Sequence, residues 1–268
     1  MDGQICFFFL KSSKLIFFFT KFNMARHPAQ RPVRNQKPDK SDRIKFDPEL
    51  VAFEIGPKKE PFLVHKEHAC RYVQVFRAAF NNEAFTEGET QVYKMEDTTS
   101  DVFRLLIHWL YAQTLDGPIW RIPRPFPQFQ NDKERDTAFA SMFPDISGDY
   151  RNLVGLWILA DYLLLPQLQN LAIDELDHLL NTFGCNINFN GVKFIWDETA
   201  PDSPLRRYAI NELARHFDFR KRSEQIKDQP GEILAALLSA MSQYRDQVLA
   251  LRPVFKGSPF YHVPVLED

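Results

Sequence analysis

Residues 62–109 read FLVHKEHACRYVQVFRAAFNNEAFTEGETQVYKMEDTTSDVFRLLIHW, and this stretch decides the fold. An apolar strand at 62–64 runs into two short helices, and a charged turn leads to a further strand at 90–95. The helix expected at about 100–113 is apolar over most of its circumference, which is typical of a buried helix. We therefore expect a central helix here, packed with a small sheet.

A second strand precedes this stretch and pairs with its beginning. In residues 49–55 the apolar side chains of Val51, Phe53 and Ile55 alternate with others, which predicts a strand with one buried face. Residues 56–61 have the composition of a turn, so the next strand returns beside the first. Because two strands alone are marginally stable, we expect the helices that follow to cover them.

The ordered set of these pieces resembles the BTB/POZ domain, in the form common in fungal proteins. The resemblance covers roughly residues 48–182, and a further match lies at 156–162. It implies an α+β fold, in which a small β-sheet is capped by a helical cluster, with an additional C-terminal α-helical region. It also places His65 where the family has a structural histidine at a strand–helix junction. The family-motif and core positions that it implies are Phe62, Val64, His65, Lys66, Phe76, Phe80, Val102, Phe103, Trp109, Leu110, Tyr111, Ala160 and Tyr162.

The resemblance implies a protein–protein interaction module without catalysis, so we expect no enzymatic activity and no cofactor. It implies two mechanisms: self-association into a homo-oligomer, or recruitment of a cullin-type ubiquitin ligase as a substrate adaptor. Self-associating members often have an apolar helix before the first strand, and cullin-binding members often have a hydrophobic-x-Glu triplet after the central helix. Residues 24–46 do not provide such an apolar helix, and no such triplet follows Tyr111 closely. The alternatives are a transcription-related nuclear scaffold and an enzyme with an unrecognised site in the C-terminal helical half.

The two ends of the chain are expected to lie outside the folded part. Residues 1–46 are predicted to form a disordered N-terminal segment, and 1–23 are hypothesised to be a gene-model artefact with Met24 as the true start. Residues 24–46 carry seven Lys/Arg against two Asp, which favours disorder and is typical of a solvated linker or a nuclear-localisation signal. Residues 253–268 are predicted to be an irregular tail.

A Pro-rich insertion at about 114–150 interrupts the predicted domain, which we place at 47–182. Asp116-Gly117-Pro118 and the prolines of 121–127 cannot propagate a helix. We interpret the insertion as a surface loop, because loop length costs little free energy. The alternative is a Pro-rich ligand for an aromatic groove.

Helical periodicity resumes at 151–182. Pro166 is expected to begin a new helix there, and Gly184 is expected to end it. Residues 183–252 are predicted to form a C-terminal helical extension, in which Ser203-Pro204 provides a cap and a first-turn proline. Two further helices are expected at about 190–198 and 230–249.

The composition argues against several classes of site and partner. The net charge of −2 and the dispersed Lys/Arg give no nucleic-acid signature in the folded part. The three cysteines, at positions 6, 70 and 185, are far apart, which favours a reducing, intracellular compartment, nucleus or cytoplasm. His65-x-x-His68-x-Cys70 is superficially similar to a metal cluster, but we expect His68 to point elsewhere and find no fourth ligand. We therefore expect other proteins as partners, and neither a metal nor a membrane.

Overall fold

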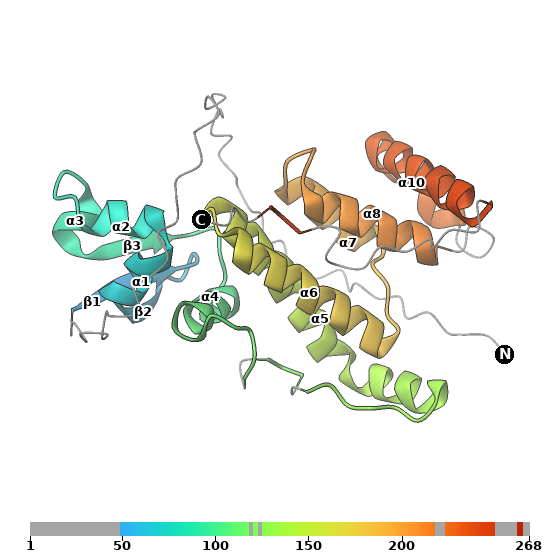
Figure 1. The fold of residues 1–268 in the computed structure, drawn as a ribbon, viewed down its shortest axis with the longest axis horizontal. Coiled ribbons are helices and arrows are strands. Elements are labelled where there is room, and N and C mark those ends of the chain that lie inside the picture. The colour runs from blue at the N-terminus through green and yellow to red at the C-terminus, as the bar shows by residue number, and fades with distance from the viewer. Residues whose placement is uncertain (1–48, 118–119, 123–124, 218–222, 250–261, 265–268) are drawn as a thin grey trace.

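The computed structural model of the chain describes residues 49–117, 120–122, 125–217, 223–249 and 262–264 (Figure 1). The predictions about residues 1–46 and most of those about 253–268 therefore lie outside the described residues. The elements follow in the order β1 Leu50–Ile55, β2 Glu60–His65, α1 Lys66–Tyr72, α2 Gln74–Phe80, α3 Thr86–Thr90, β3 Val92–Met95, α4 Ser100–Ala112, α5 Asp132–Tyr162, α6 Pro166–Phe183, α7 Phe189–Glu198, α8 Pro204–His216, η1 Ser223–Ile226 and α10 Gly231–Leu249.

The sheet has the strand order β2-β1-β3, with β1 antiparallel to β2 and parallel to β3. The alternation in β1 turns Val51, Phe53 and Ile55 inward, and all three are almost fully buried. The Phe53 ring lies 4.9 Å from the ring of Phe76 in α2 and 5.0 Å from that of Phe103 in α4. The inner face of the sheet is thus covered by helices, and the predicted hairpin is confirmed.

Helix α4 is the buried helix expected from its apolar circumference. The Thr99 hydroxyl oxygen caps its first turn by accepting a hydrogen bond from the Val102 backbone N–H at 3.3 Å. Gln113, in the left-handed conformation (φ 59°), ends the helix, and its side-chain amide donates to the Trp109 carbonyl at 2.8 Å. Trp109 itself is only 3% exposed. The prediction of a buried helix at this place is confirmed.

The expected interruption up to residue 150 is wrong, because α5 begins at Asp132 and continues through Pro144. Its start has a local signal: the Asn131 side chain accepts from the Glu134 backbone N–H at 2.9 Å. The Glu134 carboxylate in turn accepts from the Gln130 backbone N–H at 2.9 Å. This reciprocal arrangement resembles a capping box and fixes the start of α5 before the proline is reached.

In the segment between α4 and α5, several described apolar side chains are anchored in the core, while most of the other described residues are exposed. Leu115, Trp120, Ile122 and Phe126 are all buried. The Trp120 indole N–H donates to the Leu115 carbonyl at 2.7 Å. Although the prolines prevent a helix here, apolar side chains between them fill space beside the helices. The interpretation of the insertion as a surface loop is therefore wrong for these four buried residues.

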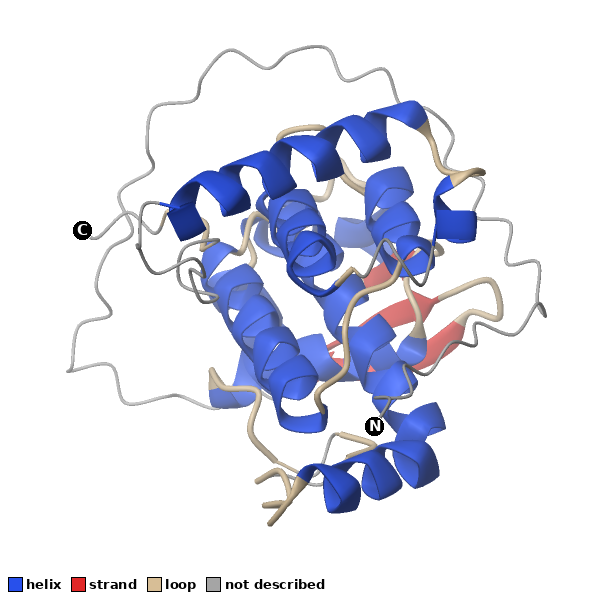
Figure 2. Cartoon of the chain, turned by 90° about the vertical axis from the view of Figure 1, so that its right-hand side faces the viewer, coloured by secondary structure: helices blue, strands red, loops and turns tan. Residues whose placement is uncertain are grey.

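The C-terminal helices begin and end where the sequence indicates. Pro166 is the first residue of α6, and Gly184 ends it with φ 60°, a conformation that glycine adopts readily. The Ser203 hydroxyl accepts from the Leu205 backbone N–H at 3.2 Å at the start of α8. Helix α10 lies across α8 and α7 on the side away from the sheet (Figures 1 and 2). These predicted helix boundaries are confirmed.

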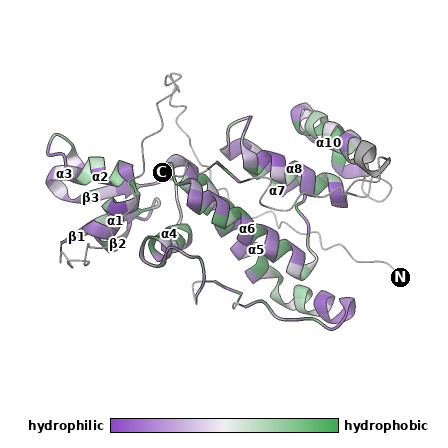
Figure 3. Ribbon diagram, in the orientation of Figure 1, coloured by the Kyte–Doolittle hydropathy of each residue, from purple (hydrophilic) through white to green (hydrophobic). Residues whose placement is uncertain are grey.

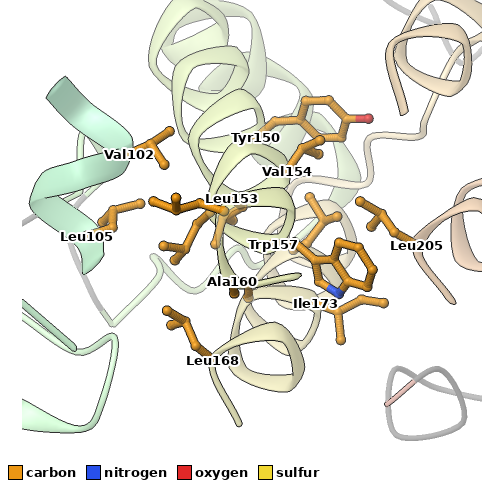
Figure 4. Close-up of a cluster of buried hydrophobic side chains, with 14 of the residues drawn as sticks. Val102, Leu105, Tyr150, Leu153, Val154, Trp157, Ala160, Leu168, Ile173 and Leu205 are labelled. Carbon is orange, nitrogen blue, oxygen red and sulfur yellow. The ribbon is translucent and has the colours of Figure 1, made fainter. Parts of the chain in front are cut away.

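The buried side chains form one continuous cluster from β1 to α10. Apolar and polar residues are interspersed along α5 and α6, as in amphipathic helices (Figure 3). Around Trp157 of α5, side chains of α4, α6 and α8 converge (Figure 4). The predicted boundary at 182/183 thus falls inside a shared core. No helix among the described residues is both long and apolar enough to cross a membrane.

Candidate interaction surface

The outer face of the sheet carries exposed apolar side chains. The alternation that buries Val51 turns Leu50 and Ala52 to the opposite side, and the strand register places Leu63 and Val92 on either side of Ala52. Leu63 is 68% exposed and Leu50 is 46% exposed. We call this set, Leu50, Ala52, Leu63 and Val92, the sheet face. Exposed large apolar residues that gather on one face are typical of a binding surface.

Charged pairs border the sheet face. The Lys94 ammonium lies 3.9 Å from the Glu54 carboxylate, its cross-strand neighbour, and the Lys66 ammonium lies 2.9 Å from the Glu49 carboxylate. The apolar centre with a charged border matches the usual composition of a protein interface. Strand β2 is an edge strand, and Pro61 within it removes one donor from the edge. Strand β3 is the other edge strand, and the sheet face extends across all three strands.

His65 joins the hairpin to the end of α4. Its backbone N–H donates to the Tyr111 hydroxyl at 3.1 Å, and its ring Nδ1 lies 2.7 Å from the same oxygen. The ring of His68 stacks on the Tyr111 ring at 4.2 Å, and the centroids of the two histidine rings are 6.0 Å apart. The expectation that His68 points elsewhere is wrong, because residues three apart at a helix start share a face.

The positions named from the family resemblance fall into three groups: half-buried, exposed and buried. Phe62 is half-buried, with its ring 5.2 Å from that of Phe103, and His65 and Lys66 are also half-buried. Tyr111 and Tyr162 are 42% and 65% exposed, so these two are surface positions and not core positions. The remaining positions are buried: Val64, Phe76, Phe80, Val102, Phe103, Trp109, Leu110 and Ala160.

An exposed ionic network ties the hairpin to α4 and to the segment after it. The Arg104 guanidinium lies 2.6 Å from the Glu60 carboxylate and 2.9 Å from that of Asp101. Asp101 also pairs with Arg121 at 2.7 Å, and Glu60 accepts a hydrogen bond from the Ser100 hydroxyl. Such exposed pairs contribute little individually to stability. Their role is to fix the orientation of neighbouring surfaces.

Asp149 is a structural position that could not be identified from the sequence. This α5 side chain is 1% exposed, and its two carboxylate oxygens accept hydrogen bonds from the backbone N–H groups of Arg121 and Ile122 at 3.1 and 3.0 Å. A buried carboxylate requires such partners. Asp149 therefore holds the Pro-rich segment against α5, and only the folded structure brings the two together.

The cysteine and histidine side chains form no metal centre in the part of the chain that the structure describes. Within those residues there is no group of three His, Cys, Asp or Glu side chains that could hold a metal ion. Cys70 and Cys185 are free thiols. Burial raises the pKa of both, that of Cys185 to about 12. Since the thiolate is the reactive form, both cysteines are expected to be inert.

A cluster of titratable side chains lies between α6 and α8. The Tyr208 hydroxyl donates to the Asp177 carboxylate at 3.1 Å. The Glu212 carboxylate lies 3.9 Å from the Arg215 guanidinium and 3.8 Å from the His216 ring, which accepts from Arg215 at 2.7 Å. Burial raises the pKa of Glu212 to about 7 and lowers that of His216 to about 4. The Glu212 side chain is 3% exposed and that of His216 is 32% exposed, so the cluster meets solvent at His216.

Replacing Glu212 by glutamine is expected to remove a contribution to the free energy of unfolding that falls as the pH rises. The ordinary pKa of 4.5 applies to the unfolded chain, whereas burial raises the folded value to about 7. As the pH rises through this window, the unfolded chain releases a proton that the folded chain retains, so the Glu212 contribution to the free energy of unfolding falls by about 3 kcal/mol. His216, whose pKa is lowered by burial, contributes with the opposite sign over much of the same window, so the prediction concerns the difference between the two proteins and not the wild type alone. Urea unfolding of both proteins across the window should show the glutamine variant gaining stability relative to the wild type. If the difference in free energy of unfolding between the two proteins does not change with pH, the assignment is contradicted. Because His216 is present in both proteins, its contribution is common to them.

Arg206 closes the end of α7. It is 8% exposed, and its guanidinium donates to the carbonyl oxygens of Trp196 and Thr199. Its Nε donates to the Thr199 hydroxyl at 3.1 Å, and the guanidinium lies 4.9 Å from the Trp196 ring centroid. The planar fork of arginine suits this geometry, and lysine does not reproduce it. The Ser203–Arg206 stretch thus begins α8 and also ends α7.

The described geometry agrees with the comparison of the chain with known families. The family model of the BTB/POZ domain matches residues 50–120, which begin at β1, include α4 and enter the segment after it. A search of curated proteins found no match. Residues 50–120, which contain the sheet face and α4, therefore match a BTB/POZ domain, and the chain has an α+β fold that continues into a C-terminal helical region.

Proposed function

We propose that this chain is a non-catalytic protein–protein interaction module that binds its partners through the sheet face. The BTB/POZ domain is a protein-interaction domain, which supports the class of function. The observation that carries the choice of surface is the exposure of Leu63 and Leu50 beside charged pairs. Because leaving large apolar side chains in water forgoes the free energy of their burial, a partner that covers them gains it.

Self-association is the use of this surface that the structure supports best. Two copies that meet through the same face bury each leucine against its equivalents, as in a two-fold symmetric dimer. The alternative, recruitment of a cullin-type ligase scaffold, was expected to use the loop after the central helix. In that loop Leu115, Trp120 and Ile122 are buried within the chain itself. Cullin recruitment therefore remains the second proposal for the role of the module.

Sedimentation velocity of the full chain tests self-association. The change Leu63→Asp introduces a charge into the sheet face, whereas Leu238→Asp places the same charge on an exposed leucine of α10. We expect the wild type and Leu238→Asp to form dimers at concentrations of about 10–100 μM, a range for modest interfaces, and Leu63→Asp to be monomeric. A monomeric wild type, or a dimeric Leu63→Asp, would contradict self-association through this face.

Two other roles are distinguished by separate observations. The transcription-related nuclear scaffold depends on residues 24–46, which lie outside the described residues, and nuclear exclusion of a tagged full chain would count against it. Among the described residues of the C-terminal half, the Asp177–Tyr208–Glu212 cluster is one place where an enzyme could have its site. The burial of Tyr208 and Glu212 favours a structural role for that cluster. We propose a nuclear or cytoplasmic location, and a form of the domain similar to that of fungal proteins.

A further inference from the structure

Residues 262–264 contact α6, although Val263 and its partner Asn170 are 93 residues apart in sequence (the dark red stretch in Figure 1). The Asn170 side-chain oxygen accepts from the Val263 backbone N–H at 2.6 Å, and the Asn170 amide nitrogen donates to the Val263 carbonyl at 3.0 Å. One primary amide thus satisfies both backbone groups of a single residue, as a neighbouring β-strand would. Asn170 therefore recognises the main chain of the segment.

The next turn of α6 contacts the residue before Val263. The His262 ring Nε2 donates to the Asp174 carboxylate at 2.7 Å. Asn170 and Asp174 are four residues apart, so both project from the same side of the helix. The Val263 side chain is partly buried and packs against the hydrophobic core. Asn170 thus contacts the main chain of Val263, Asp174 contacts the imidazole of His262, and the hydrophobic core contacts the Val263 side chain.

We propose that this side of α6 is a recognition site for an extended peptide segment, and that residues 262–264 occupy it in cis. The site selects a hydrogen-bond donor such as His, followed by a small aliphatic residue, with the backbone of that residue held by Asn170. A segment of the same pattern on a partner protein has to displace the chain's own residues. Because a tethered segment has an effective concentration in the millimolar range, it acts as an intramolecular competitor.

Hydrogen–deuterium exchange of the full chain tests the occupancy of the site. Asn170→Ala removes the amide that holds Val263, whereas Asn181→Ala removes an exposed asparagine of the same helix, whose side chain donates only within α6, to Asp177. We expect exchange of the Val263 amide to be at least about tenfold faster in Asn170→Ala than in the wild type, as for loss of a local hydrogen bond. Asn181→Ala should match the wild type. Equal exchange in all three proteins would overturn the assignment.

Binding of a labelled peptide tests recognition and competition together. The probe is a synthetic peptide with the sequence of residues 257–268, and the proteins are the full-length wild type, Val263→Asp, and Asn170→Ala combined with Val263→Asp. Val263→Asp replaces a side chain that packs against the hydrophobic core by a carboxylate, so we expect the segment to leave the site. We expect this variant to bind the peptide at least about tenfold more tightly than the wild type, in which the tethered segment competes. The double variant should not bind.

Three outcomes would overturn this proposal. The first is equal affinity of the peptide for the wild type and Val263→Asp, which would mean that the segment does not compete. The second is failure of Val263→Asp to bind the peptide at all. The third is a wild-type dimer, seen by sedimentation, that dissociates on Val263→Asp, because the segment would then occupy the α6 of a second copy.

Discussion

Replacing Trp109 by alanine is expected to lower the free energy of unfolding by about 3–5 kcal/mol, the usual range for a buried tryptophan. Trp109 is 3% exposed, and its ring centroid lies 5.6 Å from that of Tyr72 in α1. The loss combines the transfer of a large apolar surface with the cavity that remains between α4 and its neighbours. Urea unfolding followed by circular dichroism measures the change.

The matched control for this prediction is an exposed leucine of another helix. Leu238→Ala, in α10, should change the free energy of unfolding by about 0.5 kcal/mol or less, as for other surface changes. If Trp109→Ala instead costs less than about 1 kcal/mol, the helix is not buried as described, because that value is below the range for any cavity of this size.

Replacing Asp149 by alanine is expected to lower the free energy of unfolding by about 3 kcal/mol, since two hydrogen bonds to a charged acceptor are lost and two backbone donors remain without it. The donors are the N–H groups of Arg121 and Ile122, and Ile122 is fully buried. Besides the loss of stability, we expect the segment between α4 and α5 to become sensitive to limited proteolysis. Urea unfolding and mapping of the first cleavage sites measure the two effects.

Asp145→Ala provides the control for Asp149, because it removes an exposed carboxylate one turn earlier on the same helix. It should leave both the stability and the cleavage pattern unchanged. Asp149→Asn keeps one oxygen that can accept a hydrogen bond, so an intermediate loss is expected. An Asp149→Ala protein that unfolds like the wild type would show that the carboxylate does not hold the segment.

The helices whose ends have local causes could be predicted from the sequence. Pro166, Gly184 and Ser203 each act through their own backbone or their immediate neighbours, and the structure places them at the predicted ends. The alternation of Val51, Phe53 and Ile55 likewise identified the buried face of β1. Local sequence signals therefore sufficed to predict helix ends and the buried face of a strand, because each of these depends on a single element.

The start of α5 was predictable in principle but was missed. The prolines of residues 114–150 predict an interruption, whereas the Asn131-x-x-Glu134 pattern within the same range is a recognised signal for a helix start. A single proline inside a long helix removes one backbone hydrogen bond. In α5 the apolar side chains after Pro144 compensate for this loss because they pack into the core.

The pairings between distant segments could not be read from the sequence. Asp149 with Arg121, and Asn170 with Val263, join residues that only the folded chain brings together. The exposure of Leu63 has the same origin, because it depends on which face of β2 the helices cover. A sequence pattern indicates which residues are apolar or charged, but the surface that they form depends on tertiary packing.

Affinity capture from the native cells tests the central claim, that the module binds other proteins through the sheet face. The tagged full-length wild type, Leu63→Asp and Leu238→Asp are captured in parallel, and the retained proteins are quantified by mass spectrometry. We predict one set of proteins with the wild type and Leu238→Asp, including a cullin and its ring-finger subunit if the adaptor role holds, and loss of that set with Leu63→Asp. The same set from all three proteins would contradict the claim, because binding would then not depend on the sheet face.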